Sequence, residues 1–203
     1  MEYKELTNYK KIEQIQELRF CKGDHHYAVV YLKALLSDDT QMINEYEQFG
    51  TDTRHIIMNK HSYDRGLLFG FTGIKFNKYG WLDNEDFLEI ETFEFPHRKN
   101  WAVFNDITIG KGNNGKWTYG INYSTGGYGG GYGICVWGEI FDTRKECLIA
   151  ALRKIMDKHH KSRIQHKNDT LNFNAEYSKT VMKKVNELYD TITGRKSIQL
   201  SLF

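Results

Sequence analysis

The sequence predicts an α+β fold, in which an antiparallel sheet from the middle of the chain packs with helices from both ends. Three observations support this class. Apolar residues recur at helical spacing through residues 1–50, they alternate with polar residues from Phe87 onward, and helical spacing returns after Thr143. Helices and strands in separate runs are typical of α+β proteins. We expect a single domain over residues 1–192, followed by a flexible tail over residues 193–203.

The first part of the chain predicts three helices. Apolar positions follow helical spacing in residues 9–20, 25–36 and 42–49. Breaks separate them at residues 22–24 and 37–40, where the second break also offers a capping residue, and Gly50 ends the third helix.

The pattern changes after Arg54. Short apolar runs at residues 55–58 and 67–71, and the alternation at 74–76, predict strands. Residues 87–95 alternate, with Phe87, Phe93 and Phe95 on the same face as two glutamates and with Leu88 and Ile90 on the other. Pro96 ends this strand, and residues 101–109 predict another.

Residues 117–155 give the clearest local pattern. A glycine-asparagine turn at residues 111–116 joins two strand-like runs and predicts a hairpin. Residues 117–123 alternate, a glycine-rich loop follows at 126–133, and residues 134–137 predict a further strand. Thr143 and Glu146 form a capping box that opens a helix.

The last predicted helix carries a long apolar stripe that ends near Ile192. Asp169 or Thr170 is the expected N-cap, and Gly194 is the expected stop signal.

Composition narrows the class of protein. Aromatic residues make up 14% of the chain, which favours a β-containing core, and the net charge of +2 argues neither for nor against nucleic acid. Cys21, Cys135 and Cys147 have no paired spacing, so we expect reduced thiols. The N-terminus lacks an apolar signal core and no run approaches membrane-spanning length. We therefore expect a cytoplasmic protein without membrane contact.

Two segments could contact nucleic acid. The glycine-rich loop lacks the ending of a phosphate-binding loop, but its tyrosines could stack on bases. Histidine, lysine and arginine residues at 159–167 form a basic segment that could touch phosphates. The candidate residues are Tyr128, Tyr132, Lys161, Arg163 and Lys167. A mobile hairpin loop and a solvated helix end, to which we assign His159 and His166, are the structural interpretations of the same residues.

Acidic residues at 83–91 could bind magnesium in a nuclease, because Glu89 and Glu91 share a strand face. A solvent-facing acidic strand is the better interpretation, since no lysine follows at the spacing typical of many such nucleases and no second acidic cluster is evident. No serine or cysteine has the setting of a nucleophile, and no cofactor is indicated. The sequence therefore favours a non-enzymatic protein.

The last five residues, Gln-Leu-Ser-Leu-Phe, are unusually apolar for a terminus. They resemble the short peptide by which bacterial DNA polymerases and repair proteins dock on the sliding clamp. The resemblance implies that Gln199 sets the register, that Leu202 and Phe203 fill a hydrophobic pocket, and that Leu200 lies beside them with Ser201 facing outward. A tail that folds back on the chain's own core is the other interpretation.

Residues 117–155 also resemble a domain of phage and conjugative-element proteins. Together the two resemblances imply a non-enzymatic accessory protein of DNA replication, from a phage, a mobile element or a bacterium, whose partner is the bacterial sliding clamp. Two alternatives stay open. One is a metal-dependent nucleic-acid-processing enzyme that uses the acidic strand. The other is a nucleic-acid-binding module that uses the tyrosine-glycine loop and the basic segment.

Overall fold

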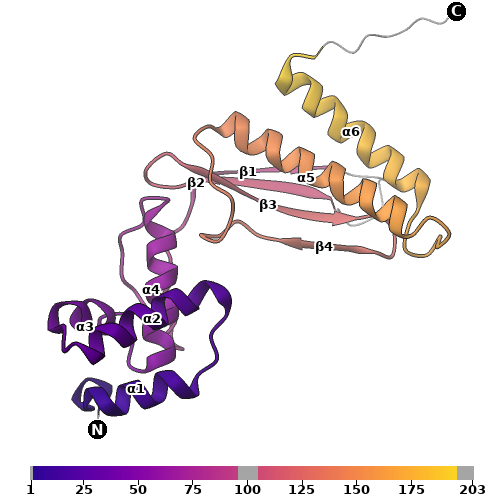
Figure 1. The fold of residues 1–203 in the computed structure, drawn as a ribbon. Coiled ribbons are helices and arrows are strands. Elements are labelled where there is room, and N and C mark those ends of the chain that lie inside the picture. Colours follow the sequence, from indigo (N-terminus) through magenta and orange to yellow (C-terminus); the bar gives the residue numbers. More distant parts are fainter. Residues whose placement is uncertain (1, 96–104, 196–203) are drawn as a thin grey trace, which may run out of the picture. The chain divides into compact units, whose positions relative to one another are not determined.

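The structure, a computed structural model, describes residues 2–95 and 105–195. Within them it contains six α-helices and, in the middle of the chain, one four-stranded antiparallel sheet, which confirms the α+β class. The chain divides into two compact units, Met1–Asp86 and Phe87–Phe203 (Figure 1). The sequence led us to expect one domain over residues 1–192. Two units form because the N-terminal helices build a core of their own, separate from the core under the sheet.

Unit 1 is helical, as the first fifty residues predict. After a short 3-10 turn at Tyr3–Glu5 come α1 (Asn8–Glu17), α2 (Lys22–Leu36), α3 (Thr40–Glu47) and α4 (Thr53–Leu67). The side chains of Thr7, Asp39 and Asp52 accept hydrogen bonds from backbone N–H groups at the starts of α1, α3 and α4. The core of the unit contains Ile15, Tyr31, Leu35, Ile43, Tyr46, Ile56 and Ile57, among others.

The strands predicted at residues 55–58 and 67–71 are wrong. The first run is one turn of α4, where Ile56 and Ile57 are fully buried against the other helices. The second run ends that helix: Gly70 takes a left-handed φ of 78°, and the Phe71 N–H donates back to the Gly66 carbonyl. A short apolar run does not distinguish a buried helix turn from a strand. The strand predicted at 74–76 is reduced to one isolated bridge, between Phe76 and Leu82.

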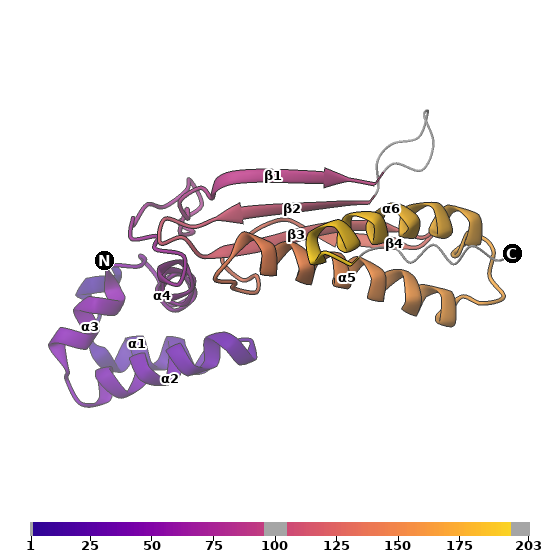
Figure 2. The same cartoon turned by 90° about the horizontal axis from the view of Figure 1, so that it is seen from above.

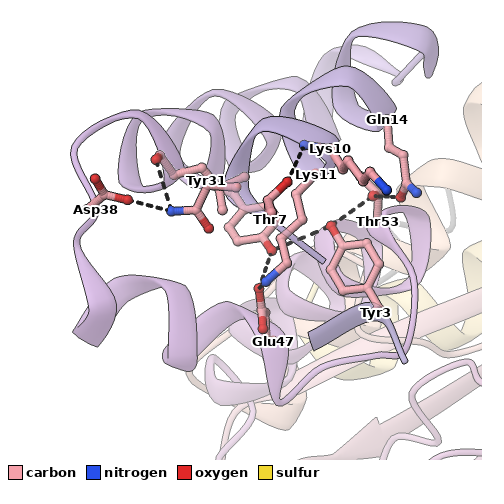
Figure 3. A network of polar contacts seen from close by, with 11 residues as sticks. Tyr3, Thr7, Lys10, Lys11, Gln14, Tyr31, Asp38, Glu47 and Thr53 are labelled. Atoms are coloured by element: carbon pink, nitrogen blue, oxygen red, sulfur yellow. Dashed lines mark hydrogen bonds and ion pairs between the residues drawn. The ribbon is translucent and has the colours of Figure 1, made fainter. Parts of the chain in front are cut away.

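A buried ion pair lies at the centre of unit 1 (Figure 3). Lys11 Nζ lies 2.6 Å from Glu47 Oε1, and the two side chains are 4% and 6% exposed. The Tyr31 hydroxyl donates to the same carboxylate over 2.8 Å, and burial raises the pKa of Tyr31. The hydroxyls of Tyr3 and Thr53 continue the network at 2.9 Å. These contacts join the start of the chain to α1, α2, α3 and α4.

Breaking this ion pair from one side is expected to destabilise unit 1 strongly. Lys11→Met leaves a buried carboxylate and Glu47→Gln leaves a buried ammonium, so each change should lower the free energy of unfolding by about 3–5 kcal/mol. The double variant keeps an acceptor for Tyr31 and buries no charge, so its loss should be smaller than the sum of the two single losses. Urea unfolding of the four proteins measures this coupling.

Lys161→Met is the matched control. Lys161 pairs with Asp157 in an exposed pair, with side chains 70% and 43% exposed. Its loss should cost less than about 1 kcal/mol. Strictly additive losses at Lys11 and Glu47 would contradict a coupled buried pair.

Unit 2 is a β-meander covered by two helices. The strands β1 (Leu88–Glu94), β2 (Asp106–Lys111), β3 (Trp117–Ser124) and β4 (Gly129–Tyr132) lie in sequence order in the sheet. The helices α5 (Arg144–Gln165) and α6 (Ala175–Thr193) follow, and α5 lies along the sheet with α6 beside it (Figures 1 and 2). The core under α5 includes Ile107, Ile109, Tyr119, Ile121, Leu148, Leu152, Ile155, Val181 and Val185.

Several predictions for unit 2 are confirmed. The β2–β3 hairpin pairs Lys111 with Trp117 around the glycine-asparagine turn. The four residues predicted to share one face of β3, Trp117, Tyr119, Ile121 and Tyr123, are all buried. The Thr143 hydroxyl accepts from the Glu146 N–H at the start of α5. Residues 101–104 of the predicted strand 101–109 lie outside the described residues.

Three predictions for unit 2 are wrong in detail. Part of the glycine-rich loop is strand β4, because glycine allows its backbone to pair closely with β3. Residues 134–137 form no strand and instead turn back across the sheet. In β1 an extra residue between Leu88 and Glu91 breaks the alternation, and Glu89 takes a φ of 46°. Leu88 and Glu91 therefore share a face.

The segment after β4 lies against the face of the sheet that α5 does not cover. A Cβ on Gly120 would meet the Tyr132 carbonyl oxygen at 2.5 Å and the Ile134 nitrogen at 2.7 Å. Thr118, which points the same way, is fully buried. The segment can approach β3 this closely only because residue 120 has no side chain.

Gly120→Ala is therefore expected to destabilise unit 2. The added methyl meets backbone atoms, which cannot move aside as a side chain can, and overpacking of this kind costs about 1–3 kcal/mol. Gly133→Ala is the matched control, because a Cβ there meets nothing within 4 Å. Thermal unfolding of both variants checks the prediction. It fails if Gly120→Ala is as stable as Gly133→Ala.

The last helix begins later than predicted. Asn174, not Asp169 or Thr170, caps α6 by accepting from the Tyr177 N–H. Asp169 instead accepts from the N–H groups of Leu171 and Asn172 and so holds the turn before the helix. Gly194 ends α6 with a φ of 72°, as predicted. None of the helices described has the length and apolar character needed to cross a membrane.

Candidate nucleic-acid interface

The structure brings two of the five candidate residues together. Arg163 and Lys167 line an open hollow of about 360 Å³ at the turn between α5 and α6. Thr170, Phe173, Asn174, Ala175 and Glu176 complete its wall. Two cationic side chains, the carboxylate of Glu176 and the aromatic ring of Phe173 thus line the same hollow. This arrangement can hold an anion that carries an apolar group.

Tyr128 does not line the hollow but packs on the turn between α5 and α6. Its backbone N–H donates to the Asn172 carbonyl, and its ring centroid lies 4.9 Å from that of His166. The side chain is 37% exposed. The preceding glycine permits the approach, since a Cβ on Gly127 would lie 2.5 Å from the Leu171 carbonyl oxygen. The turn between β3 and β4 therefore packs directly on the turn between α5 and α6.

The other two candidates lie apart from the hollow. Tyr132 is at the far end of β4, where its ring is 6.3 Å from that of Tyr119. Lys161 points along α5 and forms an ion pair with Asp157 at 2.8 Å. Tyr132 and Lys161 were predicted with the other candidates because they lie near them in the sequence. The direction of β4 carries Tyr132 away, and the position of Lys161 on α5 turns its side chain away from the hollow.

Phe173 and Glu176 were missed by the sequence analysis. An N-cap at Asp169 or Thr170 would place Phe173 inside the last helix, but the helix begins only after Asn174, and Phe173 lines the hollow from the preceding turn. The asparagine immediately after Phe173 was the signal that could have placed the helix start correctly.

His159 was predicted to lie on a basic surface, and this is wrong. The residue is 2% exposed, in the core between the sheet and α6. Its Nε2 lies 3.0 Å from Asn105 Oδ1 and its Nδ1 lies 2.8 Å from Ser178 Oγ. Asn105 Oδ1 also accepts from the Ser124 N–H, so His159 Nε2 carries the proton and Nδ1 accepts. Burial lowers the pKa of His159 to about 4. The ring is neutral and does not contribute charge to a phosphate-binding surface.

The buried histidine is expected to make unit 2 less stable in acid. Its folded-state pKa of about 4 lies below the ordinary value of 6.5, so the unfolded chain takes up the proton first. This contribution to stability is complete above pH 6.5 and is lost as the pH falls toward 4, at up to about 1.4 kcal/mol per pH unit. Urea unfolding at a series of pH values measures the slope.

The His159→Gln variant should be less stable at neutral pH. Its free energy of unfolding should also change less steeply with pH than that of the unchanged chain. The exposed neighbour His160 provides the control, since His160→Gln should keep the slope of the unchanged chain. Equal slopes for all three proteins would exclude His159 as the titrating group.

The acidic strand is neutralised by basic neighbours. Glu91 accepts two hydrogen bonds from the Arg144 guanidinium, at 2.5 and 2.6 Å, and this arginine lowers the pKa of Glu91. Glu89 pairs with Lys111 at 2.8 Å. Over residues 2–95 and 105–195, no group of three or more His, Cys, Asp or Glu side chains is arranged to hold a metal ion. The geometry therefore gives the nuclease alternative no support from this strand.

A further polar cluster lies in unit 1. Asp24 accepts from the Cys21 thiol over 2.9 Å and lies 2.7 Å from His61 Nδ1. The His61 ring stacks on Tyr27, with centroids 4.5 Å apart. The sequence did not indicate this cluster because α4 supplies His61 from a position far along the chain.

The predicted clamp-binding residues Gln199, Leu200, Ser201, Leu202 and Phe203 lie outside the described residues. The described residues end at Arg195, directly after Gly194, the glycine at which α6 ends. Comparison of this chain with protein-family models, with curated proteins and with solved structures finds no match.

Proposed function

We propose that this chain is a non-enzymatic accessory protein of DNA replication that binds the bacterial sliding clamp through Gln199–Phe203. The observation that carries the proposal is the pentapeptide Gln-Leu-Ser-Leu-Phe, each position of which fits the clamp-docking pattern. Helix α6 supports it, because Gly194 ends the helix before the peptide begins. Short recognition peptides of this kind bind in a groove on the partner.

The physical basis is recognition by a few anchors. Leu202 and Phe203 would bury their side chains in an apolar pocket of the clamp, with Leu200 beside them, and Gln199 would fix the register by hydrogen bonding at the rim. Interfaces of this type draw most of their affinity from such central anchors. Binding should therefore depend little on salt. Docking would bring the chain, which would be of bacterial, phage or mobile-element origin, to replicating DNA in the cytoplasm. It would serve either to recruit the chain to that DNA or to compete with other clamp partners.

Deletion of Gln199–Phe203 is expected to abolish binding to a purified bacterial sliding clamp, as measured by calorimetry. Phe203→Ala should cost about 2 kcal/mol or more, which is about a thirtyfold increase in Kd, because the phenyl ring is proposed to fill the pocket. Ser201→Ala is the matched control in the same peptide and should bind like the unchanged chain, since Ser201 is proposed to face outward.

Two outcomes would contradict the proposal. One is a truncated chain that binds the clamp as tightly as the full chain. The other is a full chain that does not bind at all.

A further inference from the structure

The geometry points to a second binding site: the hollow at the α5–α6 turn binds the backbone phosphate of single-stranded nucleic acid, with a neighbouring base stacked on an aromatic ring. Arg163 and Lys167 supply the charge and Phe173 supplies a ring on the wall of the hollow. Tyr128, on the β3–β4 turn that packs on the same α5–α6 turn, offers a second ring. This inference is independent of clamp binding, since the residues that line the hollow do not include Gln199–Phe203.

The two cations are available to a ligand. Both side chains are exposed, and within the described part of the chain neither has a carboxylate within 4.0 Å. Among the other basic residues of unit 2, Lys111 pairs with Glu89, Arg144 with Glu91 and Lys161 with Asp157. Charge complementarity therefore selects an anion at Arg163 and Lys167. The Glu176 carboxylate on the same wall offsets part of this charge, so affinity should be modest and sensitive to salt.

One of the two aromatic rings, that of Tyr128, is already held in place. Tyr128 is fixed by its contact with His166 and by an edge contact with Tyr123, with centroids 6.2 Å apart, yet it remains 37% exposed. Phe173 is partly exposed on the wall of the hollow. A ring that is ordered before binding loses little entropy when a base stacks on it. Stacking of this kind tolerates any base.

The open shape favours a strand over a free nucleotide. Sites for small molecules bury most of the ligand surface in a deep cavity, whereas this hollow is open and its cations are exposed to solvent. An open groove with phosphate contacts and stacking faces suits a polymer that passes across it. Double-stranded nucleic acid would keep its bases stacked on one another and could not use the rings.

The test is binding of a fluorescently labelled single-stranded oligothymidine to the full chain, without clamp, followed by anisotropy over a range of salt concentrations. Arg163→Gln combined with Lys167→Gln should weaken binding at least about tenfold at low salt. The slope of log K against log salt should fall by about 1.4, at about 0.7 for each lost phosphate contact. Tyr128→Leu should weaken binding about tenfold and leave the slope unchanged.

The control removes the same charge elsewhere in unit 2. Lys183 and Lys184 are exposed on α6, and Lys183→Gln combined with Lys184→Gln should bind like the unchanged chain. Thermal unfolding of each variant shows that it is folded. Equal weakening in both double variants would overturn the site. So would equal affinity for duplex DNA, or binding of thymidine monophosphate as tight as that of the strand, which would point to a free nucleotide.

Discussion

Unit 2 depends on one buried amide. The side chain of Asn105, at the start of the second strand, is fully buried and hydrogen-bonds the Ser124 backbone, His159 of α5 and the Tyr177 hydroxyl of α6. Each partner comes from a different element, so this single side chain sets the distance between the sheet and both helices. Buried polar groups that are fully satisfied fix one arrangement of a core, whereas apolar contacts alone permit several. The position of the α5–α6 turn, and with it the hollow, follows from this arrangement.

In unit 1 a buried ion pair, and not an amide, fixes how the helices pack. Lys11, Glu47 and Tyr31 meet where four helices converge, and apolar side chains surround them. The attraction between the two ions in a dry core offsets the cost of removing them from water only while the geometry is kept. Each unit thus combines an ordinary apolar core with one polar contact that specifies how its elements pack. The two units differ in the chemistry of that contact, but not in its effect.

The sequence predicted those features that depend on local patterns. The amphipathic helices of unit 1, the β2–β3 hairpin and the capped start of α5 each follow from spacing and turn residues within a short window. The sequence analysis failed where distant contacts decide the outcome. Ile56 and Ile57 form a helix turn because three other helices cover them, and His159 is buried because Asn105 and Ser178 satisfy both ring nitrogens. Of the residues that line the hollow, the two cations Arg163 and Lys167 were predicted, since they lie close together in the sequence. Phe173 joined them only when the start of α6 was known.

The packing of one turn on another has a thermodynamic consequence. Gly127 and Tyr128 donate backbone hydrogen bonds to Leu171 and Asn172, so the turn that carries the aromatic ring is joined to the turn that carries the cations. The wall of the hollow therefore cannot open as a separate loop without also breaking contacts to the sheet. A molecule that occupies the hollow binds only the folded unit, and linkage then raises the free energy of unfolding of unit 2 as a whole. Occupancy would appear as slower hydrogen exchange throughout the sheet as well as in the turn.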